Sequence, residues 1–92
     1  MRLRYTARAA AQIDAALAYI AARSPQGARR VRARIEATVA LLLEYPSAGR
    51  ETSNLQVRRI VVTPYPYLLD YRATAAELVI LRLRHAARAP FN

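Results

Sequence analysis

The sequence contains no cysteine, which excludes a disulfide framework and thiolate chemistry. It has one histidine and six scattered carboxylates, too few donors for a built-in zinc site, so we expect neither a metal nor a cofactor. It also lacks a signal peptide and any apolar run long enough to cross a bilayer. We therefore expect a cytoplasmic protein that makes no membrane contact.

Lysine is absent as well, and all fifteen positively charged side chains are arginines. Arginine differs from lysine because its planar fork pairs bidentately with phosphate or carboxylate. Codon bias explains the preference for arginine equally well, but it does not explain a net charge of +9. That excess of positive charge predicts an anionic partner, either nucleic acid or an acidic protein.

The length of 92 residues fits a single domain, residues 1–92, with a thin core. A chain this short buries roughly 60–65% of its unfolded surface and has no room for a large cofactor. The hydrophobic fraction of 54% is typical of globular proteins rather than disordered ones.

The first half of the sequence predicts a short strand over residues 2–5 followed by two helices. Thr6 is a suitable N-cap for a helix that reaches about Ala22. Ser24 and Pro25 stop that helix and start another, which runs to about Glu44. The short join predicts an antiparallel helical hairpin. The expected buried stripes are Ala10, Ile13, Leu17 and Ile20 in the first helix and Ala28, Val31, Ile35, Val39 and Leu42 in the second.

The second half predicts strands. A turn over residues 45–49 precedes runs rich in β-branched and aromatic residues at 57–63, 67–72 and 78–84, which are joined by short turns. Consecutive strands with short connections form an antiparallel meander. The predicted fold is therefore α+β, in the order β-α-α-β-β-β, with the helical hairpin on one face of a small, mainly antiparallel four-stranded sheet.

Side-chain alternation divides the last two strands between two faces. We assign Tyr67, Leu69, Tyr71, Val79, Leu81 and Leu83 to the face that the helices cover, and Leu68, Asp70, Arg72, Leu78, Ile80, Arg82 and Arg84 to the open face. A monomer rarely exposes a surface that is part apolar and part basic without using it. The candidate residues for binding a target or an acidic partner are Arg58, Leu68, Arg72, Ile80, Arg82, Arg84 and Arg88.

Several strings resemble the RelE/ParE superfamily of type II toxins, and the resemblance covers nearly the whole chain. The matching pieces are SP at 24–25, P-x-x-G-R at 46–50, PYLLDYR at 66–72 and LRLRHAAR at 81–88. The resemblance implies a toxin, of the kind associated with plasmid stabilisation, that forms a hetero-oligomer with a small acidic antitoxin whose C-terminal segment wraps it. It also implies one of two targets: the RelE branch cleaves mRNA on the ribosome, whereas the ParE branch inhibits DNA gyrase without hydrolytic chemistry.

The residue chemistry favours the ParE branch. Cleavage of RNA through the 2′-OH needs groups that move protons near neutral pH, and arginine, with a pKa above about 12, is unsuited to that. His85 is the one residue that titrates there without special tuning. The ribonuclease branch, as the resemblance implies, uses lysine and a late tyrosine, whereas this chain ends in Phe91 and Asn92 and has Leu68 after Tyr67.

We therefore expect no catalytic residues and a toxin that acts on gyrase. If the chain is a nuclease, the candidate catalytic residues are His85, Arg50, Arg72, Arg82 and Arg88. Structural roles remain open for His85, as a hydrogen-bonding residue at a strand end, and for Arg50, which follows the turn glycine. A non-catalytic nucleic-acid-binding module is a minor alternative, because the charge fits but no helix-turn-helix, zinc finger or stacking aromatic pair is evident.

Overall fold

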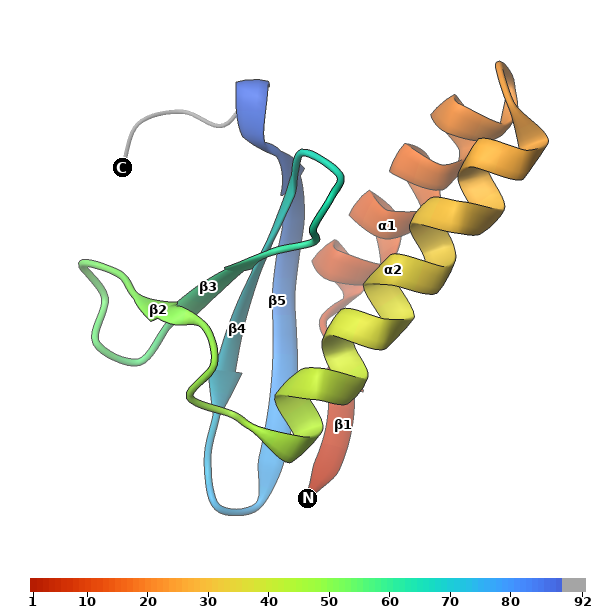
Figure 1. Ribbon diagram of the computed structural model, residues 1–92. Helices are drawn as coiled ribbons and strands as arrows, with labels where there is room; N and C mark the ends of the chain where they lie inside the picture. Colours follow the sequence, from red (N-terminus) through yellow and green to blue (C-terminus); the bar gives the residue numbers. More distant parts are fainter. Residues whose placement is uncertain (89–92) are drawn as a thin grey trace.

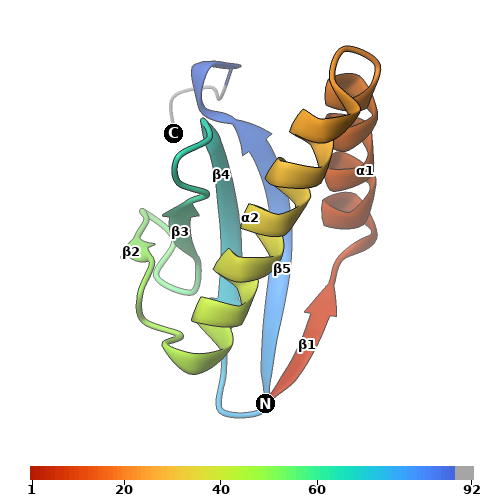
Figure 2. The same cartoon turned by 45° about the vertical axis from the view of Figure 1, so that its right-hand side comes forward.

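The computed structural model describes residues 1–88 and shows two layers, a helical hairpin and a sheet (Figure 1). The helices lie side by side on one face of the sheet, as both views show (Figure 2). This confirms the predicted α+β class. The elements are β1 (Arg2–Tyr5), α1 (Ala7–Ala21), α2 (Pro25–Glu44), β2 (Arg50–Glu51), β3 (Arg58–Val61), β4 (Tyr67–Ala73), β5 (Glu77–His85) and the 3₁₀ turn η1 (Ala86–Arg88).

The helix starts lie where the sequence predicts them. The Thr6 hydroxyl accepts a hydrogen bond from the Ala9 N–H at 3.0 Å, and the Ser24 hydroxyl accepts one from the Gly27 N–H at 2.9 Å. Each hydroxyl satisfies a backbone donor that has no partner within its helix. Pro25 occupies the first turn of α2, where its missing N–H is not needed.

The sheet has five strands in the order β1-β5-β4-β3-β2, one more than predicted. β1 runs parallel to β5, and the other pairs are antiparallel. The additional strand is β2, whose two residues pair with Arg58 and Arg59 of β3. Two residues carry no alternation of polar and apolar side chains, so the sequence gives no signal for this strand.

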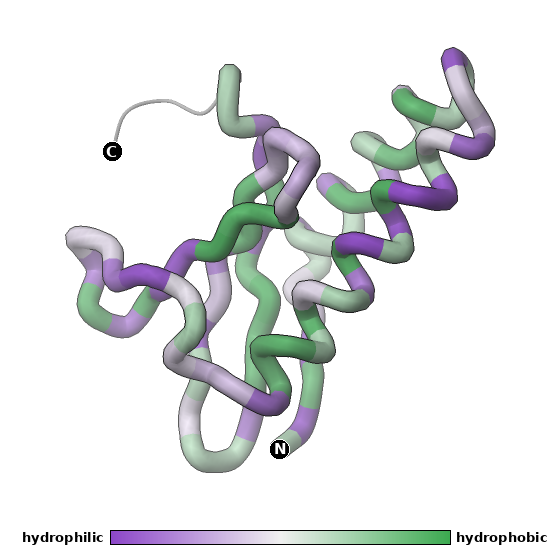
Figure 3. The backbone as a smooth tube through the Cα atoms, in the orientation of Figure 1, coloured by the Kyte–Doolittle hydropathy of each residue, from purple (hydrophilic) through white to green (hydrophobic). Residues whose placement is uncertain are grey.

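The core lies between the hairpin and β3, β4 and β5. The run 78–81 of β5 is hydrophobic and the rest of that strand is mixed, while hydrophilic residues alternate with apolar ones along α2 (Figure 3). The predicted stripe of α2 is confirmed at Val31, Ile35, Val39 and Leu42, and Ala28 is half-buried. In α1, Ala9 is buried and Ala10 is exposed. Among residues 1–88, no helix is long and apolar enough to cross a membrane. The core cluster contains Ala9, Leu17, Val31, Ile35, Val39, Leu42, Val62, Leu69, Tyr71, Leu78, Ile80 and Leu83.

A β-bulge in β5 makes part of the predicted face assignment wrong. Asp70 pairs with Arg82, but the next residue, Tyr71, pairs with Ile80, which leaves Leu81 as the extra residue. A bulge inserts one residue into the alternation, so side chains before and after it follow opposite parity.

The consequences differ on the two sides of the bulge. After it, Leu83 lies in the core, and Arg82 and Arg84 both reach Asp70, as expected. Before it, Leu78 and Ile80 were expected on the open face but are core residues with 0% of their surface exposed. Leu81 is half-buried and lines a groove with Asp70 and Arg82, so its predicted place beneath the helices is wrong.

Candidate functional site

An aspartate surrounded by arginines lies on the three central strands. Asp70 of β4 stands directly opposite Arg59 of β3 on one side and Arg82 of β5 on the other. Arg59 donates to both carboxylate oxygens, Nε to Oδ1 at 2.7 Å and Nη2 to Oδ2 at 3.2 Å. Arg82 Nε donates to Oδ2 at 2.6 Å, and Arg84 Nη2 donates to the same oxygen at 3.4 Å. We call Arg59, Asp70, Arg82 and Arg84 the arginine cluster.

The electrostatics of the arginine cluster depend on the burial of its carboxylate, which is only 1% exposed. Burial opposes the ionisation of Asp70, but the hydrogen bonds from Arg59 and Arg82 outweigh it and hold the pKa of Asp70 below its usual value. The same bond to Asp70 raises the pKa of Arg59. Burial, with repulsion from Arg82 and Arg59, lowers the pKa of Arg84. All four groups are therefore charged near neutral pH, and together they carry a charge of +2.

A polar groove of about 340 Å³ lies beside the arginine cluster. Arg59 and Arg82 form one side, and Arg50 and Glu51 of β2 contribute the other charges. Thr52, Ser53, Asn54 and Val57, from the loop between β2 and β3, complete it. This groove brings together Arg50 and Arg82, two of the candidates for the nuclease alternative.

The other predicted site residues have different surroundings. Arg58 donates from Nη1 to the Gly49 carbonyl at 2.8 Å and forms an ion pair with Glu51 at 3.7 Å. Leu68 and Arg72 are half-buried. The prediction that Ile80 binds a partner is wrong, because Ile80 is fully buried in the core and has no exposed surface. The side chain of Arg88, like Phe91 and Asn92, lies outside what the structure describes.

His85 ends β5 in a separate groove. Its ring meets Tyr67 edge-on, with 5.3 Å between the centroids, and its Nδ1 accepts a hydrogen bond from the Ala87 N–H at 3.2 Å. That groove is lined also by Gln12 and Tyr19 of α1 and by Arg84 of the arginine cluster, whereas Arg50 and Arg82 line the polar groove. Among residues 1–88, no group of three or more His, Cys, Asp or Glu side chains is placed to hold a metal ion.

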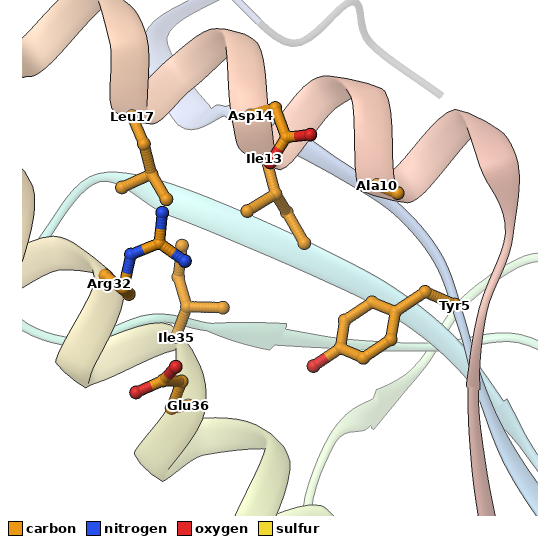
Figure 4. A pocket seen from close by; sticks show the side chains of 8 residues that line it. All are labelled: Tyr5, Ala10, Ile13, Asp14, Leu17, Arg32, Ile35 and Glu36. Carbon is orange, nitrogen blue, oxygen red and sulfur yellow. The ribbon is translucent and has the colours of Figure 1, made fainter.

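Two further grooves border α2, and sequence reasoning missed both. The groove between the helices, about 190 Å³, has an apolar floor where Ile13, Leu17 and Ile35 point toward one another (Figure 4). Its charged lining residues are Asp14, Arg32 and Glu36. Burial, followed by the charge of Glu36, raises the pKa of Tyr5 at one end of it. This groove has more negative than positive charge.

The groove between α2 and β3 is apolar and basic. It has a volume of about 510 Å³, and Arg34 is the one charged residue among those that line it. Leu41 and Val61, 43% and 49% exposed, lie on its opposite sides, and Arg34 Nε donates to the Thr63 carbonyl at 2.8 Å. The run Leu41-Leu42-Leu43 was the available signal, since three consecutive helical residues cannot all face one core.

Comparison with known proteins identifies the family. A model described as "ParE toxin of type II toxin-antitoxin system, parDE" matches residues 3–90. The chain belongs to the ParE toxin family. It is 39% identical to "Putative toxin Y4kP" of Sinorhizobium fredii, over 92% of this chain and 88% of that protein. It is 38% identical to "Toxin RelE2" of Caulobacter vibrioides, over 91% of this chain and 93% of the relative.

A solved structure agrees with this ParE-family assignment. The chain superimposes on a chain of the "Chromosomal ParDE TA system from P. aeruginosa" with a TM-score of 0.79 and 27% identity. The match covers 92% of this chain and 95% of the other. The predicted membership of the RelE/ParE superfamily is thus confirmed.

Proposed function

We propose that this ParE-family toxin inhibits DNA gyrase, that it cleaves no RNA, and that a cognate acidic antitoxin neutralises it in the cytoplasm. The observation that carries the proposal is the surroundings of His85, the one side chain suited to proton transfer near neutral pH. Its Nδ1 is engaged by the Ala87 N–H, and its ring packs on Tyr67. These contacts support a structural role for His85 at the end of β5.

The positions and the chemistry of the arginines also support a toxin that cleaves no RNA. A ribonuclease needs a group that stabilises the crowded phosphate and groups that move the two protons. Arg50 and Arg82 suit the first role, but they line a different groove from His85, and arginine stays protonated. Arg84 lines the groove of His85, but it donates to the Asp70 carboxylate at 3.4 Å, and this arrangement supports a toxin without cleavage chemistry.

The antitoxin surface of this proposal is the groove between α2 and β3. A net charge of +9 favours an acidic partner, and Arg34 is the one charged residue in this groove, beside the exposed side chains of Leu41 and Val61. An amphipathic acidic segment can bury apolar side chains against Leu41 and Val61 and place a carboxylate on Arg34. The groove between the helices suits such a segment less well, because Asp14 and Glu36 would repel it.

Two assays run on the same purified toxin test the target. We expect inhibition of supercoiling by DNA gyrase at toxin concentrations that leave mRNA intact on programmed ribosomes. The specific reason to include the ribosome is the relative named "Toxin RelE2". Ribosome-dependent cleavage without any effect on gyrase would overturn the proposal and establish the ribonuclease alternative.

A further inference from the structure

We propose that Asp70 is a specificity-determining residue that keeps nucleic acid off the basic face of the sheet. Its carboxylate fills, from within the chain, the place that a phosphate would otherwise take between Arg59, Arg82 and Arg84. This goes beyond the toxin's target, because it concerns an anion site that the fold builds and then occupies with its own side chain.

The geometry of the contacts is that of anion recognition. Four N–H groups from three guanidinium groups converge on the two oxygens of Asp70, at 2.6 to 3.4 Å. Arginine recognises carboxylate and phosphate with the same planar fork. The strand register places Arg59 and Arg82 on either side of Asp70, so their convergence is a property of the sheet.

The site borders a groove that an external anion can reach. Arg82 is 33% exposed at its side chain, and both Arg82 and Arg59 line the polar groove that Arg50 also enters. The hydroxyl and amide groups of Thr52, Ser53 and Asn54 line the rest. Without the Asp70 carboxylate, Arg50, Arg59 and Arg82 would face a groove of about 340 Å³ in which Glu51 is the one negative lining residue, so the lining would carry a net charge of +2.

The Asp70 carboxylate outcompetes an external phosphate for the guanidinium groups because the fold holds it in place. The residue is 1% exposed and lies on a strand with neighbours on both sides, so the sheet holds its carboxylate between Arg59 and Arg82. A phosphate that displaced it would leave an ionised carboxylate buried without partners, which is strongly unfavourable. A phosphate placed beside it would face a negative charge already bonded to the same guanidinium groups.

The test replaces the carboxylate with its neutral amide, Asp70→Asn, and measures binding of a short labelled single-stranded RNA. We expect affinity to rise by about tenfold or more, because the repulsive charge is removed and the guanidinium groups are released. The slope of log K against log salt should steepen by about 1.4 if two arginines each neutralise one phosphate. Glu51→Gln is the matched control, since it changes the net charge equally at the groove that Arg59 and Arg82 line, and it should raise affinity less than about threefold.

Two further measurements keep the proposal testable if Asp70→Asn folds poorly. The pair Asp70→Asn with Arg84→Gln keeps the net charge at +9, lowers the repulsion within the cluster, and should still bind the RNA more tightly than the wild type. In the otherwise wild-type chain, Arg82→Gln should weaken RNA binding no more than Arg2→Gln, whose position on β1 pairs with Glu77 at the other end of β5. Equal gains for Glu51→Gln and Asp70→Asn, no gain in a folded Asp70 variant, or a selective loss in Arg82→Gln would each overturn the proposal.

Discussion

The hydroxyl of Tyr71 fastens the loop at Gly49 to the centre of the sheet. It accepts a hydrogen bond from the Gly49 N–H at 2.8 Å and donates one to the Pro46 carbonyl at 2.6 Å. Gly49 approaches so closely that a Cβ atom there would lie 2.6 Å from the hydroxyl oxygen and 3.0 Å from the Arg59 carbonyl. The join between α2 and β2 therefore depends on a tyrosine hydroxyl that both accepts and donates, and on a residue without a side chain.

Changes at either partner should destabilise the toxin. Tyr71→Phe leaves the Gly49 N–H and the Pro46 carbonyl without this partner, and we expect the free energy of unfolding to fall by about 1–3 kcal/mol. Gly49→Ala forces the tyrosine ring or the backbone of Arg59 to move, and we expect a loss of about 1–3 kcal/mol. Urea unfolding followed by circular dichroism measures both.

Gly27→Ala is the control for the glycine change. Gly27 lies in the first turn of α2, where a Cβ atom would meet the Ser24 hydroxyl at 3.0 Å, the end of a small exposed side chain. Moving Ser24 weakens its N-cap bond with the Gly27 N–H, and the preference of alanine over glycine for a helix, up to about 1 kcal/mol, offsets that cost, so we expect a change close to zero. An equal loss at Gly27 and Gly49 would show that the contact with Tyr71 has no special role.

Asp70 should make the free energy of unfolding depend on pH in the acid range. Its pKa is lowered in the folded chain, so the stabilisation is complete above its unfolded value of about 3.9 and is lost as the pH falls through the folded value. Asp70→Asn should be less stable at neutral pH by about 3–5 kcal/mol and should lose the part of the acid dependence that Asp70 supplies. Urea midpoints measured from neutral pH down through the folded pKa of Asp70 compare Asp70→Asn with the wild type. If the urea midpoints of the wild type and of Asp70→Asn changed with pH in parallel, Asp70 would not be the source of the acid dependence.

The bulge in β5 predicts different effects for two neighbouring leucines. Leu83 belongs to the core cluster, and Leu83→Ala should lower the free energy of unfolding by about 2–5 kcal/mol. Leu81 is half-buried outside that cluster, so Leu81→Ala should lower it by about 1 kcal/mol or less. Thermal or urea unfolding of the two variants measures both losses of stability. Equal losses would mean that both side chains face the helices.

The sequence predicts the helices and the layer arrangement because their signals are local. Thr6, Ser24 and Pro25 act on backbone groups within one turn, so a reader of the sequence can place the helix starts correctly. The bulge at Leu81 is different, since it arises from how β5 meets β4, and no local pattern marks it. One inserted residue reverses the parity of the strand and places Ile80 in the core.

The candidate site was partly predictable for a related reason. The pattern of charges indicated that Arg82 and Arg84 share a face, which is correct after the bulge. It could not show that Arg59 and Asp70 stand opposite one another, because that depends on the register of β3 with β4. Arginines that looked available for a partner are therefore bonded to an aspartate of their own chain.

His85→Ala should separate structural from catalytic roles. If the histidine only packs on Tyr67 and accepts from the Ala87 N–H, its loss should reduce toxicity modestly, in step with reduced stability. A nuclease that used it to carry protons should lose activity by roughly a hundredfold or more. Growth after induced expression and gyrase supercoiling measure toxicity, and the thermal midpoint of the same variant provides the stability reference.

The proposed antitoxin surface predicts which changes should weaken the binding of an antitoxin. Leu41→Glu places a charge in the groove between α2 and β3, and Arg34→Glu reverses the single charge among the residues that line it. Each should weaken binding of the cognate antitoxin by about tenfold or more, because an acidic apolar segment would lose burial in one case and meet repulsion in the other. Calorimetry with the purified antitoxin measures the affinities.

The controls for these two variants are matched in chemistry and differ in place. Leu55→Glu introduces the same charge at a leucine that is 86% exposed in the loop between β2 and β3, and Arg30→Glu reverses an exposed charge on α2 that does not line the groove. Both controls lower the net charge as much as their partners do, so a purely long-range attraction would weaken all four complexes alike. Selective loss in Leu41→Glu and Arg34→Glu supports docking between α2 and β3. Uniform loss would mean that the antitoxin responds to the net charge of +9 and that its apolar contacts lie elsewhere on the toxin.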